Sequence, residues 1–286
     1  MRTHQIRAMT ARDVDAATNL LAAGDWGDRR SWFEFATTQP ECRPIVAESE
    51  GEIVGTGVGT VNGGVGWVGT IFVPDRLRGR GLGGRLTERV CEDLDGAGCR
   101  TVVLVSTPKA LPLYRRLGFV EQTRYEILEA PGLPFAGDLS AARGPEVAAV
   151  RPFEPNDLTA MAALDVVATG EDRAHALRRF ATPASAKVLV GAGGTIRGFV
   201  VRAPWGGGAT IASTPDDAMA ILDARRRAAG PNGRVRVGIV AENEAGLRRL
   251  RRDGLRPIWQ APRLARGHPL AWQPDRIWGQ FNHAMG

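Results

Sequence analysis

The residues best placed to do chemistry form a loop rich in glycine and arginine, from Pro74 to Gly84. It lies between an apolar strand-like segment, Thr70 to Val73, and a helix expected to begin near Leu82. Helix N-termini present unpaired N–H groups and the positive end of a dipole, so they attract phosphate. Glycines let a backbone approach a diphosphate closely. We therefore predict a diphosphate site in which charge-assisted bonds come from Arg78, Arg80 and Arg85.

The same loop also satisfies the dinucleotide fingerprint GxGxxG, from Gly79 to Gly84. That motif requires a strand ending almost at the first glycine and an acidic residue about 20 residues later, at a strand end. Here residues 74–78 intervene, and the expected strand Thr101 to Ser106 is followed by no carboxylate. The sequence therefore disfavours a Rossmann fold.

The elements around this loop can be read from periodicity and turn residues. Apolar residues recur every four positions from Leu82 to Leu94, which predicts an amphipathic helix. The Asn62-Gly63-Gly64 sequence predicts a hairpin turn. The further expected elements are strands at Ile45–Glu48, Ile53–Val61, Gly66–Val73 and Thr101–Ser106, and a short helix through Tyr114 that ends at Gly118.

The chain also resembles itself. Residues 6–14 are echoed by 150–158 at an offset of 144, and both predict a strand followed by a capped helix. Residues 51–55 match 194–198, and 117–119 match 253–255, at offsets of 143 and 136. Three matches in the same order predict two related domains.

A proline- and glycine-rich stretch separates the two expected domains. We place the first domain at 1–130, a linker at 131–148 and the second domain at 149–286.

Two ordered motifs in the first half resemble the GCN5-related N-acetyltransferase (GNAT) superfamily. The first runs from Val73 through the arginine-glycine loop to Gly83, and the second joins Ala110, Tyr114 and Leu117-Gly118-Phe119. The resemblance covers roughly residues 5–128 and implies an enzyme that uses acetyl-CoA. It implies that the loop amides bind the CoA diphosphate, that the preceding strand pairs with pantetheine, and that Tyr114 protonates the departing thiolate. The implied cofactor-binding residues are Ile71, Phe72, Val73, Arg78, Gly79, Arg80, Gly81, Leu82, Gly83, Gly84 and Thr107, the last standing where the family has an asparagine.

The second half resembles the divergent C-terminal half of bacterial tandem GNAT proteins. Its expected phosphate segment, residues 211–217, has no glycine loop and carries two carboxylates, and Leu250 stands where a tyrosine would be needed. We expect a degenerate domain that shapes the substrate cleft, packs on the first domain or forms a homodimer. The fold class is thus α/β (α+β), with two GNAT-like domains, each a mixed, mostly antiparallel sheet flanked by helices.

The general base is not evident from the sequence. Glu34 and Asp28 lie in a polar-aromatic stretch that could line an amine pocket, although each is also typical of a solvated surface acid, and a water chain would serve as well. Trp32, in the same stretch, is a pocket wall or a core residue.

Composition limits the remaining choices. The formal net charge of +6 comes almost wholly from arginine, since Lys109 and Lys187 are the only lysines among 37 basic residues. Two arginine runs, residues 225–227 and 248–252, fit a solvated face better than a nucleic-acid site, because no aromatic residues interleave with them. No apolar run of 18 residues and no secretory signal is evident, and the three cysteines fit reduced thiols, so we expect a cytoplasmic protein. The histidines suggest no metal site.

Together these features predict an N-acetyltransferase that moves acetyl from acetyl-CoA directly to a primary amine of a small molecule or a protein. The alternatives are a CoA-binding sensor or docking module without catalysis, and an arginine-driven nucleic-acid binder.

Overall fold

The computed structural model describes residues 4–134 and 149–286. It divides the chain into two compact units. The first consists of Met1–Gln122, Pro262–Pro269 and Asn282–Gly286, and the second of Thr123–Ala261 and Leu270–Phe281. The units therefore exchange segments across the boundaries expected from the sequence, because strands β6 (Val120–Pro131) and β12 (Arg256–Gly267) each run from one unit into the other. Most of the expected linker, residues 135–148, lies outside the described residues.

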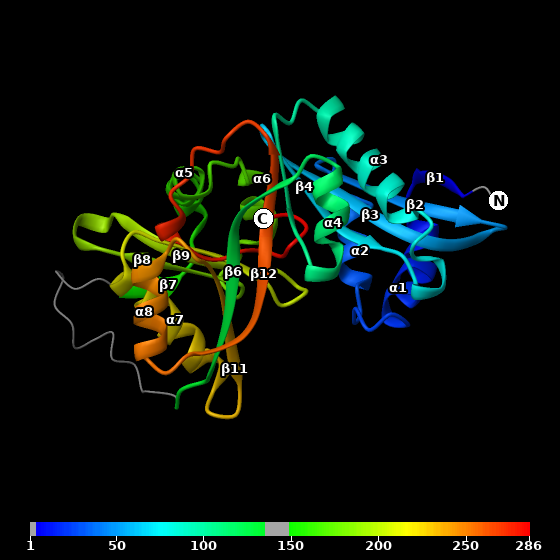
Figure 1. The fold of residues 1–286 in the computed structure, drawn as a ribbon. Coiled ribbons are helices and arrows are strands. Elements are labelled where there is room, and N and C mark those ends of the chain that lie inside the picture. The colour runs from blue at the N-terminus through cyan, green and yellow to red at the C-terminus, as the bar shows by residue number, and fades with distance from the viewer. Residues whose placement is uncertain (1–3, 135–148) are drawn as a thin grey trace. The chain divides into compact units, whose positions relative to one another are not determined.

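The first unit is a sheet with helices on its faces (Figure 1). Its strands follow the order β1–β2–β3–β4–β5, with the second half of β12 added beside β5. All of these pairs are antiparallel except β4 with β5, which is parallel. Its elements are β1 Gln5–Ala8, α1 Val14–Ala22, α2 Arg30–Ala36, β2 Cys42–Ser49, β3 Glu52–Asn62, β4 Val65–Phe72, α3 Leu82–Gly96, β5 Thr101–Val105 and α4 Leu111–Arg116, followed by β6 Val120–Pro131, which continues into the second unit.

The second unit has a five-stranded antiparallel sheet in the order β13–β10–β9–β8–β7. Strand β11 pairs antiparallel with the part of β6 from Tyr125 to Pro131. Its elements are β7 Ala149–Pro152, α5 Leu158–Thr169, α6 Ala174–Phe180, β8 Ala186–Val190, β9 Ile196–Arg202, β10 Gly208–Ala212, α7 Pro215–Ala229, β11 Arg234–Val240, α8 Glu244–Arg252, β12 Arg256–Gly267 and β13 Ile277–Gly279. The predicted fold class, two mostly antiparallel sheets flanked by helices, is confirmed, although only the first unit has a mixed sheet.

The internal repeat is confirmed in structural detail. Arg7 holds Asp13 with two hydrogen bonds of 2.8 Å, and Arg151 holds Asp157 in the same way at 2.7 Å. Each aspartate closes a capping box before its helix. The matched glycines also agree, since Gly118 and Gly254 both end a helix at a positive φ, of 83° and 86°.

The core of the first unit forms where α3 packs on the sheet. Leu86, Val90 and Leu94 are fully buried and project from one face of the helix. They meet a row of glycines on β3: a Cβ at Gly55 would lie 2.9 Å from Leu86, and one at Gly57 3.1 Å from Val90. The alternating glycines therefore leave room for the side chains of α3 against the sheet, which fixes the position of the loop before the helix.

Candidate active site

The loop before α3 has a backbone that requires glycine. Gly79 and Gly81 have φ of 77° and 80°, and nothing lies within 4 Å of where a Cβ would be at either position. Glycine is thus selected there for conformation and not for space. Arg78 fixes the start of the loop, because its Nε donates to the Val73 carbonyl at 2.9 Å and its guanidinium pairs with Asp75. Residues 78–81 are exposed.

The N-terminus of α3 is left without a side-chain cap. Its N-cap residue, Gly81, has a left-handed backbone conformation and no side chain that could accept a hydrogen bond from the amides of the first turn. The first hydrogen bond across this end runs from Arg85 N to Gly81 O, at 3.1 Å. The amides of Leu82, Gly83 and Gly84 therefore have no partner within the helix, as its geometry requires. This end of α3 has the donors and the dipole that a diphosphate needs.

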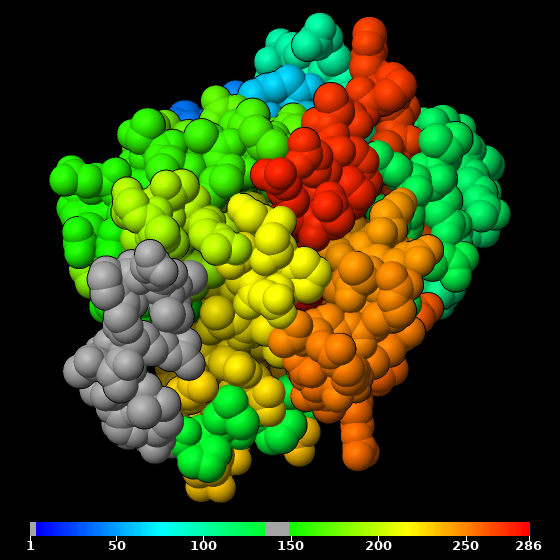
Figure 2. Space-filling view, turned by 90° about the vertical axis from the view of Figure 1, so that its left-hand side faces the viewer, coloured from blue at the N-terminus to red at the C-terminus, as the bar shows by residue number. Residues whose placement is uncertain are grey.

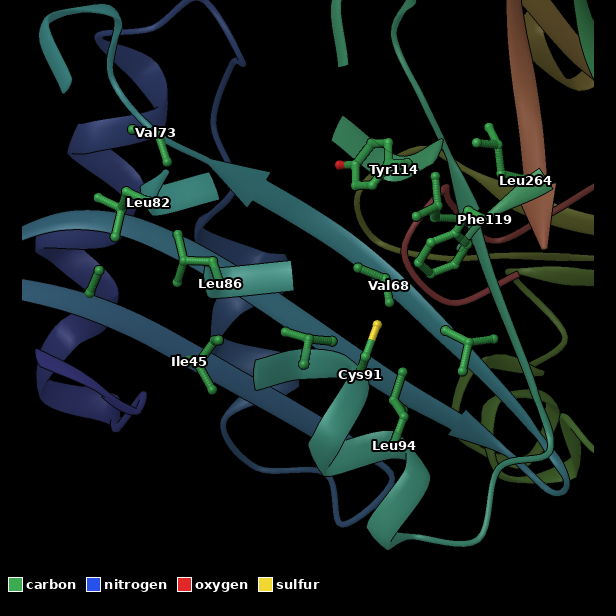
Figure 3. Packing of buried hydrophobic residues seen from close by; sticks show 14 of the residues in the cluster. Ile45, Val68, Val73, Leu82, Leu86, Cys91, Leu94, Tyr114, Phe119 and Leu264 are labelled. Carbon is green, nitrogen blue, oxygen red and sulfur yellow. The ribbon is translucent and has the colours of Figure 1, made fainter. Parts of the chain in front are cut away.

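Two side chains fix the loop from below. Val73 precedes the loop and Leu82 follows it, and both point into the cluster of buried residues beneath α3 (Figure 3). Their exposed fractions are 8% and 2%. The loop is therefore held at both ends by the core while its middle faces solvent.

Strand β4 is irregular at the end that leads to the loop. Its pairing with β3 shifts between Val58↔Gly69 and Thr56↔Phe72, so that Thr70 and Ile71 together oppose Gly57. Thr70 has a φ of 53°, which is rare for a threonine and marks a bulge. Its parallel pairing with β5 ends at Val68↔Leu104, before β4 itself ends. An extended ligand could therefore pair with the last residues of β4.

Two hydrogen bonds hold the bulge. Thr56 Oγ1 donates to the Thr70 carbonyl at 2.8 Å, and Trp32 Nε1 donates to Thr70 Oγ1 at 3.0 Å. Sequence reasoning missed Thr56 and Thr70, because the irregular register that gives them a role leaves no mark in an apolar segment. Trp32, which the sequence left open between core and pocket wall, is 2% exposed and belongs to the support of β4.

Tyr114 lies on α4 at the edge of the α3 core. It is 7% exposed, and its ring contacts Phe119 edge-on at 6.1 Å between centroids. Its hydroxyl points away from Phe119 and Leu264 (Figure 3). Burial raises the pKa of Tyr114 to about 12, and the nearby Cys91 adds to the effect. The hydroxyl is thus protonated throughout the physiological range and can act as a proton donor.

The other predicted site residues are more exposed. Thr107 is exposed at the end of β5, where its carbonyl accepts from Ser106 Oγ at 2.8 Å. Asp28 is exposed and accepts from the Arg30 amide at 2.8 Å before α2. Glu34 lies one turn further, 3.9 Å from the Arg30 guanidinium, with 59% of its side chain exposed. Among the described residues, no group of three metal-binding side chains gathers in one place.

The corresponding helix of the second unit has a closed N-terminus. Thr214 caps α7 and accepts from the Asp217 amide at 3.2 Å. Pro215 takes the first helical position, and the acidic Asp216 and Asp217 occupy the first turn. Asp217 is also paired with Arg197 at 2.9 Å. The Thr214 side chain thus satisfies an amide at this helix end, and the two carboxylates would repel a phosphate. The first unit presents bare amides at the same place.

Within the described part of the chain, the strand beside α7, β10, leaves no free edge for a ligand. β10 pairs with β9 without any register shift, and β13 covers its other edge through Thr210↔Gly279 and Ile211↔Ile277. Leu250, which the sequence places where Tyr114 stands in the first unit, is fully buried in the hydrophobic cluster of this unit.

The arginine runs of the second unit are largely ion-paired. Figure 2 shows the side of the molecule on which the yellow and orange segments of this unit, including α7 and α8, reach the surface. On α8, Arg249 contacts Asp253 at 2.7 Å and Arg251 contacts Glu126 at 2.5 Å. On α7, Arg226 lies 3.5 Å from Asp223. These carboxylates neutralise much of the charge that nucleic-acid binding would need.

Comparison with known proteins agrees with both units. The Acetyltransferase (GNAT) family profile matches residues 11–119, and an Acetyltransferase (GNAT) domain profile matches residues 161–279. The chain therefore belongs to the GNAT superfamily of acetyltransferases and carries two GNAT domains in tandem.

Curated relatives share only a segment with this chain. Glucosamine 6-phosphate N-acetyltransferase 1 of Oryza sativa subsp. japonica is 42% identical over 60 residues, which are 21% of this chain and 36% of the rice protein. The IAA acetyltransferase of Azospirillum brasilense is 34% identical over 89 residues, 29% of this chain and 58% of that protein. The chain thus matches from about a third to somewhat more than half of the length of these relatives.

Solved structures match over the whole chain. A candidate acetyltransferase from Pyrococcus horikoshii aligns with a TM-score of 0.80 and 22% identity, covering 100% of this chain and 97% of that one. A GCN5-related N-acetyltransferase from Sphaerobacter thermophilus aligns with a TM-score of 0.67 and 18% identity, covering 94% and 98%. At these identities the matches establish a shared fold.

Among the described residues, no helix combines the length and the apolar character that crossing a bilayer requires.

Proposed function

We propose that the first domain is an N-acetyltransferase that moves the acetyl group of acetyl-CoA directly to a primary amine. The observation that carries this proposal is the uncapped N-terminus of α3, reached through a loop whose Gly79 and Gly81 adopt positive φ in open space. These features fit the diphosphate of CoA, because bare amides and a dipole stabilise negative charge. Gly79 to Gly84 hold the diphosphate, and Arg78 and Arg80 add positive charge.

The last residues of β4 bind the pantetheine arm. Ile71, Phe72 and Val73 follow the point where β4 and β5 stop pairing, so their backbone groups can form a ladder with an extended ligand. A backbone N–H from this stretch also stabilises the charge that develops on the thioester oxygen. Thr107, at the end of β5, borders the same ligand. Acetyl-CoA supplies the activated acyl group, and binding it beside the amine replaces a collision with an oriented encounter worth about 7–11 kcal/mol.

Protons move through side chains at the edge of this site. Tyr114 gives its proton to the departing sulfur. The raised pKa of Tyr114, about 12, keeps its hydroxyl protonated until that step. Glu34 or Asp28, both in solvent contact on or before α2, takes up the proton of the amine through water. The second domain does not bind acetyl-CoA, since Thr214 and two aspartates occupy the equivalent helix end.

Free-thiol release from acetyl-CoA over a panel of amines tests the proposal. The panel includes amino-sugar phosphates, because the rice relative is named for glucosamine 6-phosphate, together with amino acids, aminoglycosides and peptides with free amines. We expect turnover with at least one class. Protein that acetyl-CoA stabilises against heat but that consumes no thioester would instead be a sensor.

Replacing Tyr114 tests the proton donor. Tyr114→Phe should lower kcat by about 10²–10⁴-fold and leave the thermal stabilisation by acetyl-CoA unchanged. Tyr125→Phe, at the only other tyrosine, is the matched control and should keep its kcat. In the same assay, Glu34→Gln and Asp28→Asn show which acid serves, through a drop of about tenfold or more in kcat/KM for the amine.

A further inference from the structure

The C-terminal end of the chain is built into the sheet of the first unit. Thr60 Oγ1, on β3, donates to the Ala284 carbonyl at 2.9 Å, and Asn62 Nδ2 donates to the Met285 carbonyl at 3.0 Å. Both donors are fully buried, and Ala284 and Met285 are 6% and 0% exposed. Buried hydrogen bonds to backbone carbonyls hold a segment in one conformation, because breaking either takes a donor away from a buried carbonyl. Figure 1 shows this end, in red, beside β4.

The same segment presses directly on β4. A Cβ at Gly69 would lie 2.1 Å from the Ala284 Cβ, 2.4 Å from its Cα and 3.2 Å from the His283 carbonyl oxygen. The φ of Gly69 is not positive, so glycine is required there for space and not for conformation. Because Gly69 has no side chain, Ala284 can pack directly against the strand.

This contact lies immediately before the bulge of β4. Thr70 follows Gly69 and holds the unusual φ of 53°, a conformation that persists only when its surroundings impose it. Thr56 and Trp32 restrain Thr70 itself. The C-terminal segment restrains Gly69, the residue before Thr70. Pairing with β5 does not restrain Gly69, because that pairing has ended at Val68.

We propose that residues Asn282–Gly286 are a positioning element of the transfer site, which holds Gly69 to Ile71 in the conformation that receives the thioester. The proposal rests on the proposed function for its catalytic consequence, but its structural part can be tested without turnover. It assigns no chemistry to the segment, which acts through the backbone of β4.

A substitution at Thr60 releases the segment with little change of shape. Thr60→Val removes the hydroxyl that donates to Ala284 and keeps the side-chain volume, whereas Thr60→Ser keeps the donor. The matched control is Thr101→Val. Thr101 is also buried, and its Oγ1 donates at 2.8 Å to the carbonyl of His268, but at the opposite end of β5, where Val65 begins β4.

We expect Thr60→Val and Thr101→Val to lower the Tm by a similar amount, about 2–4 °C. Only Thr60→Val should lower kcat, by about tenfold or more, with the affinity for acetyl-CoA within about twofold of the unaltered protein, since small misplacements at a site are costly. Thr60→Ser should restore kcat. Equal kcat values in Thr60→Val and Thr101→Val would overturn the proposal.

Hydrogen exchange separates failure of this inference from failure of the proposed function. The amides of residues 69–72 should exchange about tenfold faster or more in Thr60→Val and at the normal rate in Thr101→Val. If the unaltered protein consumes no thioester, the transferase proposal fails while the exchange result still decides whether the segment restrains β4. Unchanged exchange at residues 69–72 in Thr60→Val would refute the restraint itself.

Discussion

Substituting alanine for Gly81 tests whether the α3 end binds acetyl-CoA. Gly81 has a φ of 80°, and no atom lies within 4 Å of the added Cβ, so Gly81→Ala creates conformational strain without a clash. The left-handed conformation costs an alanine about 1–2 kcal/mol. The loop can relieve this cost only by changing φ, which turns the amides at the start of α3 away from a common point.

The expected loss of affinity follows from those amides. A hydrogen bond to a charged group contributes about 1.5–3 kcal/mol, so losing one should weaken acetyl-CoA binding by about 10–150-fold. The strain itself should lower the Tm by about 2–8 °C. Calorimetric titration with acetyl-CoA measures the first effect, and thermal unfolding without ligand measures the second.

Gly98→Ala is the matched control for this experiment. Gly98 has a φ of 86°, also with nothing within 4 Å of a Cβ, but it follows the other end of α3. The strain and the loss of Tm should be similar, and the affinity for acetyl-CoA should not change. If Gly81→Ala binds acetyl-CoA as tightly as Gly98→Ala does, the reasoning about the loop is refuted.

Two further predictions concern the repeated architecture. Arg7 lowers the pKa of Asp13 to about 2 through their hydrogen bonds, so the pair stabilises the fold above pH 3.8 and this contribution is lost as the pH falls towards 2. Asp13→Asn should therefore cost about 1–2 kcal/mol at pH 7 and flatten the acid limb of unfolding, and an unaltered acid limb would contradict the pairing. Thr214→Ala should remove the α7 cap at a cost of about 1 kcal/mol and leave the affinity for acetyl-CoA unchanged, whereas weaker binding would place a ligand in the second domain.

The sequence predicted the local features of the first domain, because local chemistry determines them. The residue types Gly79 and Gly81 marked the loop, and both have a positive φ in the structure; the four-residue period from Leu82 to Leu94 placed α3. The two-residue turn at Gly63 and Gly64 was readable from residue type. The repeat was also visible, since the residues that conserve its geometry are short motifs with fixed spacing.

The two units of the structure do not follow the domain boundaries expected from the sequence, because contacts between residues far apart in the chain define the units. β6 and β12 each pass between the units, so that Leu264, in the second half of the chain, completes the core beneath α3. The expected boundaries at 130 and 149 follow composition, which carries no information about strand pairing. A fragment ending at 130 keeps β4 beside β5 but lacks β12, which pairs with the other edge of β5.

The sequence alone was enough to predict the glycine-arginine loop, the helix after it and the tandem repeat, because each depends on neighbouring residues. The bulge at Thr70, and the hydrogen bond from Thr60 to a carbonyl 224 residues away, became visible only in the folded chain. A small residue such as Gly69 looks the same in a sequence whether it is needed for conformation or for space. The identity of the atom that fills that space is fixed only when distant segments pack together.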